Sequence, residues 1–267
     1  MRPFFYTNSM NEEAPKVTEL EHERPKRARG IYLLPNLFTT AALFSGFYAV
    51  LASMNGAFEK AAIAIFVAMV LDGLDGRVAR LTNTQTAFGA EYDSLSDMVA
   101  FGLAPALVIY QWALVDLGRL GWLAAFIYTA GAALRLARFN SAIATADKRW
   151  FTGLPSPSAA AIIAGSVWLG VDKGLSGPAV GWLALLLTVA AGLLMVSNIC
   201  YHSFKQIDFR GKVPFFAIVA VMLAFAVVLV DPAPVLFLVF MGYTISGPAL
   251  ALWRRWKRRR RGLAENE

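Results

Sequence analysis

Residues 71–102 read LDGLDGRVARLTNTQTAFGAEYDSLSDMVAFG and hold four of the nine aspartates in this 267-residue chain. The four are Asp72, Asp75, Asp93 and Asp97, and apolar segments lie on both sides of them. An acidic side chain inside a membrane span costs about 2.5–3.5 kcal/mol on insertion scales, so acidic residues there are functional by default. The stretch therefore predicts both membrane helices and a functional site between them.

The whole chain is too apolar for a water-soluble domain of its size. Hydrophobic residues make up 57% of it and charged residues only 16%, and the mean hydropathy is +0.53. Ordinary soluble domains are about 45–50% apolar and about 25% charged. The single cysteine also excludes an internal disulfide. The composition thus excludes a disordered chain, a disulfide scaffold and a soluble enzyme, and it indicates a polytopic helical membrane protein.

A polar arm at 1–30 is followed by a series of apolar segments. Their lengths are close to the about 20 residues that a helix needs to cross a bilayer. Eight such segments lie near 32–53, 58–80, 92–115, 119–138, 155–171, 178–199, 213–230 and 233–252. We therefore expect an all-α polytopic bundle of about eight transmembrane helices with short connections. The last segment contains GYTISGPALALW and is the least apolar of the eight.

Basic residues concentrate on one side of the predicted bundle. The connections at 81–91, 139–153 and 200–212 share that side with both termini, and with the adjoining helix ends they carry Arg77, Arg80, Arg135, Arg138, Lys148, Arg149, Lys205, Arg210 and Lys212. The opposite connections hold only Lys60, Arg119 and Lys173. The positive-inside rule then predicts that both termini and the aspartates face the cytoplasm.

The tail at 253–267 contains the run RRWKRRRR directly after an apolar segment. Such a position favours anionic lipid headgroups or a topology signal, and we expect no nucleic-acid partner.

Helical periodicity predicts that the four aspartates converge. At 100° per residue, one helix presents Asp72, Gly76 and Ala79 on one stripe with Asp75 beside it, and the next helix presents Gly89, Asp93 and Asp97. Four carboxylates in one place repel unless cations bind them, and oxygen-only ligands favour Mg²⁺ or Mn²⁺. The small residues leave room for a phosphorylated ligand, which a metal polarises for displacement. One spare carboxylate can deprotonate an incoming hydroxyl. The rival hypothesis is a proton or ion pathway.

Further polar residues are candidates for substrate contacts. Arg135, Arg138 and Asn140 could hold a carboxylate, because the arginine fork matches its two oxygens; the alternative for the arginines is a positive-inside anchor. Asn36 and Thr39 could line a nucleotide pocket. Lys205 could bind a phosphate or a carboxylate, or lie at the membrane interface with its charge in water.

The aspartate motif resembles that of the CDP-alcohol phosphotransferases. Their pattern, D-x2-D-G-x2-A-R-x8-G-x3-D-x3-D, is matched without a gap by Asp72, Asp75, Gly76, Ala79, Arg80, Gly89, Asp93 and Asp97. Outer stretches are similar to the phosphatidylserine-forming branch, namely LPNLFTTAALFSGFYA at 34–49, RLARFN at 135–140, FTGLPSPSAA at 151–160 and SNICYHSFK at 197–205. The resemblance covers most of residues 31–212.

The resemblance implies a fold and an activity. The fold is a six-helix catalytic core, here 31–212, which commonly dimerises, and two additional helices at 213–252 complete the eight. The activity is metal-dependent transfer of the phosphatidyl group of CDP-diacylglycerol to L-serine, with release of CMP. The chain is then a phosphotransferase of phospholipid biosynthesis whose partners are both substrates, the bilayer and a second copy of itself.

The resemblance also implies roles for the motif residues. Asp72, Asp75 and Asp93 bind a divalent ion with the pyrophosphate, while Asp97 completes a second metal position and activates the hydroxyl. The small residues let the cytidine nucleotide approach, and Arg80 contacts phosphate or orients an aspartate.

Two alternatives remain open at this point. A sister enzyme of the same family would use choline, glycerol phosphate or an inositol phosphate as acceptor. Choline requires aromatic faces around a cation, whereas Arg135 and Arg138 favour a carboxylate. An ion transporter would place carboxylates near the bilayer midplane between two related halves, and the sequence has no second half that mirrors the first.

Overall fold

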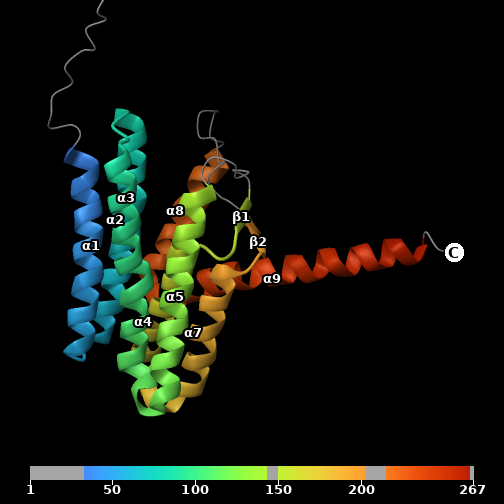
Figure 1. Cartoon of the computed structure of the whole chain (residues 1–267). Coiled ribbons are helices and arrows are strands. Elements are labelled where there is room, and N and C mark those ends of the chain that lie inside the picture. Colours follow the sequence, from blue (N-terminus) through green and yellow to red (C-terminus); the bar gives the residue numbers. More distant parts are fainter. Residues whose placement is uncertain (1–32, 143–149, 203–214, 265–267) are drawn as a thin grey trace, which may run out of the picture.

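The computed structural model describes residues 33–142, 150–202 and 215–264 (Figure 1). Its α-helices are α1 (Leu33–Met54), α2 (Phe58–Thr82), α3 (Ala87–Asp97), α4 (Ala104–Ile109), α5 (Arg119–Ala142), α6 (Ser156–Asp172), α7 (Gly181–Val196), α8 (Phe215–Val230) and α9 (Pro232–Ala264). Short 3-10 turns occupy Val115–Leu117 and Gly177–Val180. The described residues are thus almost entirely helical, which confirms the predicted fold class.

Five helical segments are long and apolar enough by themselves to cross a bilayer: Leu34–Met54, Ala87–Leu117, Arg119–Ser141, Gly177–Val196 and Pro232–Trp253. The other three predicted spans are also helices. Helix α2 has 25 residues but carries charged side chains, and α6 and α8 have 17 and 16 residues. Many large apolar side chains on the outer helix faces are exposed, as contact with lipid requires. The chain is an integral membrane protein, and the count of eight spans stays a prediction for α2, α6 and α8.

Residues 87–117 form one long helix that is not regular throughout. Two π-helical segments interrupt it, Met98–Leu103 and Tyr110–Leu114. In the first, the amide of Ala104 donates to the carbonyl of Val99, five residues back. Pro105 explains this wider turn, because its ring lacks an amide hydrogen and clashes with the carbonyl four residues earlier in a regular helix. The sequence predicted one uninterrupted helix here.

Small side chains allow the central helices to pack closely. Helix α1 packs against α2 and α3, α5 packs against α7, and α6 packs against α2 and α9. Alanines fill these contacts, and Ala49, Ala61, Ala62 and Ala100 are completely buried. Between membrane helices, small residues bring the backbones together and increase van der Waals contact.

Helix α9 begins beside the end of α6 and runs back along it. Lys173, which follows α6, pairs with Asp172 at 2.7 Å and with Asp231, just before α9, at 3.7 Å. A Cβ atom added at Gly165 in the middle of α6 would lie 3.3 Å from the Cα of Phe237. The two helices are therefore antiparallel neighbours over their apolar parts.

Two short strands, β1 (Trp150–Thr152) and β2 (Cys200–His202), pair in antiparallel register and are the only strands among the described residues. No strands were expected from the sequence. Phe151 lies opposite Tyr201 in this pair. The strands therefore join the start of α6 to the segment that follows α7.

The end of α9 projects away from the bundle at a large angle to α5 and α7 (Figure 1). The predicted basic tail at 253–267 is helical as far as Ala264 and continues α9 without a break. The predicted arm at 1–30 lies outside the described residues.

Candidate active site

A tight turn brings the two halves of the aspartate motif together. Helix α2 ends at Thr82, and Asn83 adopts the left-handed conformation (φ 51°) that commonly closes a helix. Thr86 then caps α3, because its hydroxyl accepts a hydrogen bond from the amide of Gly89 at 3.0 Å. Only residues 83–86 separate the helices, so the end of α2 and the start of α3 are held side by side.

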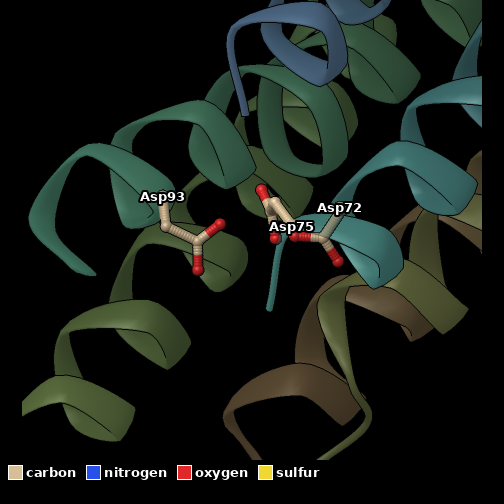
Figure 2. A group of neighbouring side chains, drawn as sticks. All are labelled: Asp72, Asp75 and Asp93. Atoms are coloured by element: carbon tan, nitrogen blue, oxygen red, sulfur yellow. The ribbon is translucent and has the colours of Figure 1, made fainter. Parts of the chain in front are cut away.

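Three carboxylates converge between these helices. One oxygen each of Asp72 and Asp75, on α2, and of Asp93, on α3, lie within 4.8 Å of one another. Figure 2 shows the three side chains gathered in the space between the helices. Asp75 is 5% exposed and the other two are half-buried. The structure thus brings together the first three aspartates as the helical spacing predicted.

The fourth aspartate lies beside this triad. Asp97 is one helical turn beyond Asp93, on the last residue of α3, and its carboxyl is within hydrogen-bonding reach of that of Asp72. Two carboxylates in contact repel unless a proton or a cation lies between them. The site therefore has four carboxyl groups, of which three share one potential cation position and the fourth contacts an edge of it.

Helix α1 orients one of the carboxylates. The hydroxyl of Thr39 donates to Oδ2 of Asp75 at 2.7 Å and also reaches the carbonyl of Pro35 at 3.1 Å. Thr39 is 3% exposed, and Ser96 of α3 donates to its carbonyl at 3.1 Å. Thr39, a candidate nucleotide contact from the sequence, thus contacts a carboxylate directly and fixes its orientation.

The remaining motif residues surround the same space. A Cβ atom added at Gly89 would lie 3.1 Å from Oγ1 of Thr86 and 3.5 Å from Oδ1 of Asn36, so a larger residue there would press on both side chains. A Cβ atom added at Gly76 would meet the guanidinium of Arg80 at 3.6 Å. Ala79 is half-buried on the same helix. Asn36 of α1 therefore lies beside Gly89 of α3.

Arg135 points into the interior close to the aspartates. Its Nη1 donates to the hydroxyl of Ser156, the first residue of α6, which is completely buried. Asp97 and Tyr243 of α9 lie within electrostatic reach of the guanidinium. The Nε atom is buried and has no hydrogen-bond partner among the described residues. Arg135 thus presents a buried, incompletely used donor edge beside Asp97.

The other candidate acceptor residues make structural contacts. Arg138 is exposed, and its Nη2 donates to Oδ1 of Asn198 at 2.8 Å, which ties α5 to the end of α7. The amide of Asn140 donates to the hydroxyl of Ser94 at 3.0 Å, next to Asp93. Lys205 lies outside the described residues. The contacts of Arg135 and Arg138 thus differ, although the sequence alone gives both arginines the same candidate role.

The donor set fits a hard divalent cation. All the converging groups are carboxylate oxygens, the ligands that Mg²⁺ and Mn²⁺ prefer. Their mutual separation is compatible with one cation bound among Asp72, Asp75 and Asp93. A cation bound there supplies the charge that makes a pyrophosphate reactive, and a neighbouring carboxylate can accept a proton.

Two contacts near the site were not expected from the sequence. Ser96 positions α3 against Thr39, and Tyr243 of α9 approaches Arg135. No local motif marks Ser96. Tyr243 lies in the last predicted span, and the polar residues of that span were the available signal that α9 makes polar contacts.

Comparisons with known proteins agree with this geometry. A family model described as CDP-alcohol phosphatidyltransferase matches residues 32–193. A CDP-diacylglycerol–serine O-phosphatidyltransferase of Helicobacter pylori is 39% identical over 218 residues, which cover 81% of this chain and 90% of the relative. A Mycobacterium leprae protein of the same name is 32% identical over 245 residues, covering 87% and 79%.

An archaeal relative extends the likeness. The archaetidylserine synthase of Methanothermobacter thermautotrophicus is 36% identical over 178 residues, covering 66% of this chain and 72% of the relative. The region that the family model matches, residues 32–193, contains all four aspartates of the site. The chain belongs to the CDP-alcohol phosphatidyltransferase family.

Proposed function

We propose that this protein is a phosphatidylserine synthase, which transfers the phosphatidyl group of CDP-diacylglycerol to the hydroxyl of L-serine and releases CMP. One observation carries the proposal: the carboxylates of Asp72, Asp75 and Asp93 converge in a chain whose bacterial relatives are named for transfer to serine. An archaeal relative is also named for a serine lipid. The relatives named are synthases, so the ion-transport alternative is not carried forward.

The metal requirement is part of the proposal. Asp72, Asp75 and Asp93 hold a divalent ion, Mg²⁺ or Mn²⁺, and Asp97 completes the position of a second. When bound, these ions neutralise the charge that develops on the pyrophosphate as CMP leaves. The all-oxygen donor set and the contact between Asp97 and Asp72 support this assignment.

The chain's own residues then perform three tasks. The nucleotide and pyrophosphate lie against the side of the site formed by Asn36, Thr39, Gly76, Ala79, Arg80 and Gly89. Asp97 accepts the proton of the serine hydroxyl, because an alcohol is a poor nucleophile at neutral pH without a base. The serine oxygen forms a bond to the phosphorus nearest the lipid. The bond from that phosphorus to the bridging oxygen breaks, and CMP departs with that oxygen.

Arg135 is the better supported of the two arginines as the partner of the serine carboxylate. It lies within electrostatic reach of Asp97 and its buried Nε has no partner among the described residues, whereas Arg138 is exposed and bound to Asn198. A bidentate arginine–carboxylate pair needs two adjacent N–H groups. Arg138, Asn140 and Lys205 remain secondary candidates, with Asn140 acting through Ser94.

The site faces the cytoplasm in this proposal. Arg77 and the motif arginine Arg80 lie near the end of α2, and Asn140 near the end of α5 contacts α3, so Arg138 belongs to the same end of the bundle. A concentration of arginines at one end marks the cytoplasmic side. A homodimer, the state implied by the family resemblance, completes the proposal, and light scattering of the solubilised protein tests it.

The acceptor is tested by release of CMP from CDP-diacylglycerol by the purified protein in detergent with Mg²⁺ or Mn²⁺. Serine, choline, glycerol 3-phosphate and inositol phosphate are supplied separately. The proposal predicts release with serine alone, and chelation of the divalent ion abolishes it. Release with another of the four acceptors in place of serine would keep the family and overturn the assigned acceptor.

A further inference from the structure

Helix α9 lies beyond residue 193, where the family model ends, and yet it packs against α6 and β2. Its contact runs through Tyr201 of strand β2, which is completely buried. The hydroxyl of Tyr201 donates to the backbone carbonyl of Thr244 at 3.1 Å. A buried hydrogen bond thus joins the short strand pair to α9.

The sequence of α9 explains why this carbonyl is available. In a regular helix the carbonyl of Thr244 would accept the amide hydrogen of residue 248, but that residue is Pro248 and has none. A buried carbonyl without a partner is costly, and the Tyr201 hydroxyl supplies the missing donor. Burial, with a smaller contribution from nearby Tyr243, raises the pKa of Tyr201 to about 12, so this hydroxyl stays protonated at neutral pH.

The same contact fixes the position of a second tyrosine. The rings of Tyr201 and Tyr243 have centroids 5.5 Å apart, and Gly247 lies against the Tyr201 ring, where a side chain would not fit. Tyr243 is half-buried on the part of α9 that packs against β2, and β2 pairs with β1, which closely precedes Ser156, the hydrogen-bond partner of Arg135. The contact between Tyr201 and α9 therefore fixes Tyr243 at the end of the bundle where Arg135 meets Ser156.

Two polar atoms near this contact have hydrogen-bonding capacity that the described residues do not fill. Nε of Arg135 and Oγ1 of Thr244 are both buried and have no hydrogen-bond partner within the described parts of the chain. Ser156 holds the guanidinium from the side of α6. A buried donor edge on a fixed arginine next to Asp97 suits a small carboxylate-bearing acceptor.

Resting on the proposed function, we propose that α9 forms one wall of the acceptor subsite, and that Tyr243, fixed by the Tyr201–Thr244 contact, is a positioning residue that holds Arg135 for the acceptor carboxylate. In the proposed function, the nucleotide side of the site is built from residues of α1, α2 and α3 and not from residues of α9. Changes in α9 should therefore alter the use of serine and leave the use of CDP-diacylglycerol unchanged.

The test compares KM values for the two substrates in Tyr243→Phe and Tyr201→Phe, which lose a hydroxyl and keep the ring. The matched control is Tyr48→Phe on the exposed face of α1. We expect each test variant to raise KM for serine about tenfold, equivalent to about 1.4 kcal/mol. We expect KM for CDP-diacylglycerol within about twofold of wild type, and no change in the control. Unchanged KM for serine, or equal rises for both substrates, would overturn the proposal.

A second variant tests the claim without removing any side chain near Arg135. Pro248→Ala supplies an amide that competes with Tyr201 for the Thr244 carbonyl, and this weakens the contact between Tyr201 and α9. It should raise KM for serine selectively, and a wild-type value would contradict the proposed role of the contact. If the wild-type protein used another acceptor, the proposed function would fail. A selective change in the KM for that acceptor in the α9 variants would still support α9 as a wall of the acceptor subsite.

Discussion

Replacement of Thr39 by valine removes the hydroxyl that orients Asp75 while keeping the shape of the side chain. The hydroxyl donates to Oδ2 of Asp75 at 2.7 Å, and Thr39 is only 3% exposed. Water therefore cannot readily take its place. In Thr39→Val the carboxylate keeps its position on α2 but is free to rotate away from Asp72 and Asp93.

The size of the effect follows from the nature of this bond. A hydrogen bond to a charged group contributes about 1.5–3 kcal/mol, and about 1.4 kcal/mol corresponds to a factor of ten. Loss of a group that orients a metal ligand typically weakens metal affinity about 10–100-fold. We therefore expect Thr39→Val to raise the divalent-ion concentration for half-maximal activity by about that factor, with a smaller change in kcat at saturating metal.

The assay is CMP release titrated with Mg²⁺ or Mn²⁺ at fixed substrates. Thr188→Val is the matched control, because Thr188 is also buried and, among the described residues, its hydroxyl bonds to the carbonyl of Ala184, four residues back, and not to a carboxylate. Thr39 makes a similar bond to Pro35, so the difference between the two variants isolates the contact with Asp75. Equal metal dependence in both variants and the wild type would refute the reasoning.

Three further predictions follow from the site. Asp97→Asn nearly abolishes turnover and leaves CDP-diacylglycerol binding largely intact, because the amide cannot accept the hydroxyl proton; wild-type turnover would remove Asp97 from this role. Arg135→Ala raises KM for serine by about 10–100-fold, and exposed Arg138→Ala raises it much less, as initial rates at varied serine would show. Tyr201→Phe lowers the midpoint of thermal unfolding, and Pro248→Ala in the same background recovers part of the loss, since it restores a backbone donor; additive losses would contradict this.

The sequence predicted the helices well because their information is local. Each predicted span contains a helix in the structure, since apolar runs of sufficient length leave the backbone no partner in lipid except itself. The convergence of Asp72, Asp75 and Asp93 was also predictable, because helical spacing and a short connection determine it. For this convergence, a few residues that are close together in the sequence carried enough information.

The contacts that the sequence did not reveal are long-range. Arg135 and Arg138 are three residues apart and chemically identical, and only the packing of α5 leaves one half-buried and the other exposed. The β1–β2 pair joins residues about fifty apart, and each strand is too short to show a pattern. Tyr201 and Pro248 become related only when α9 packs against the strand pair.

The central claim is that this site joins serine to the phosphatidyl group and releases CMP. The most direct test measures, in one reaction of the purified protein, labelled serine that enters lipid and CMP that is released. We expect one phosphatidylserine for each CMP, with both products abolished by a chelator and restored by Mg²⁺ or Mn²⁺. CMP release without labelled lipid, or labelled lipid formed in the absence of divalent metal, would contradict it.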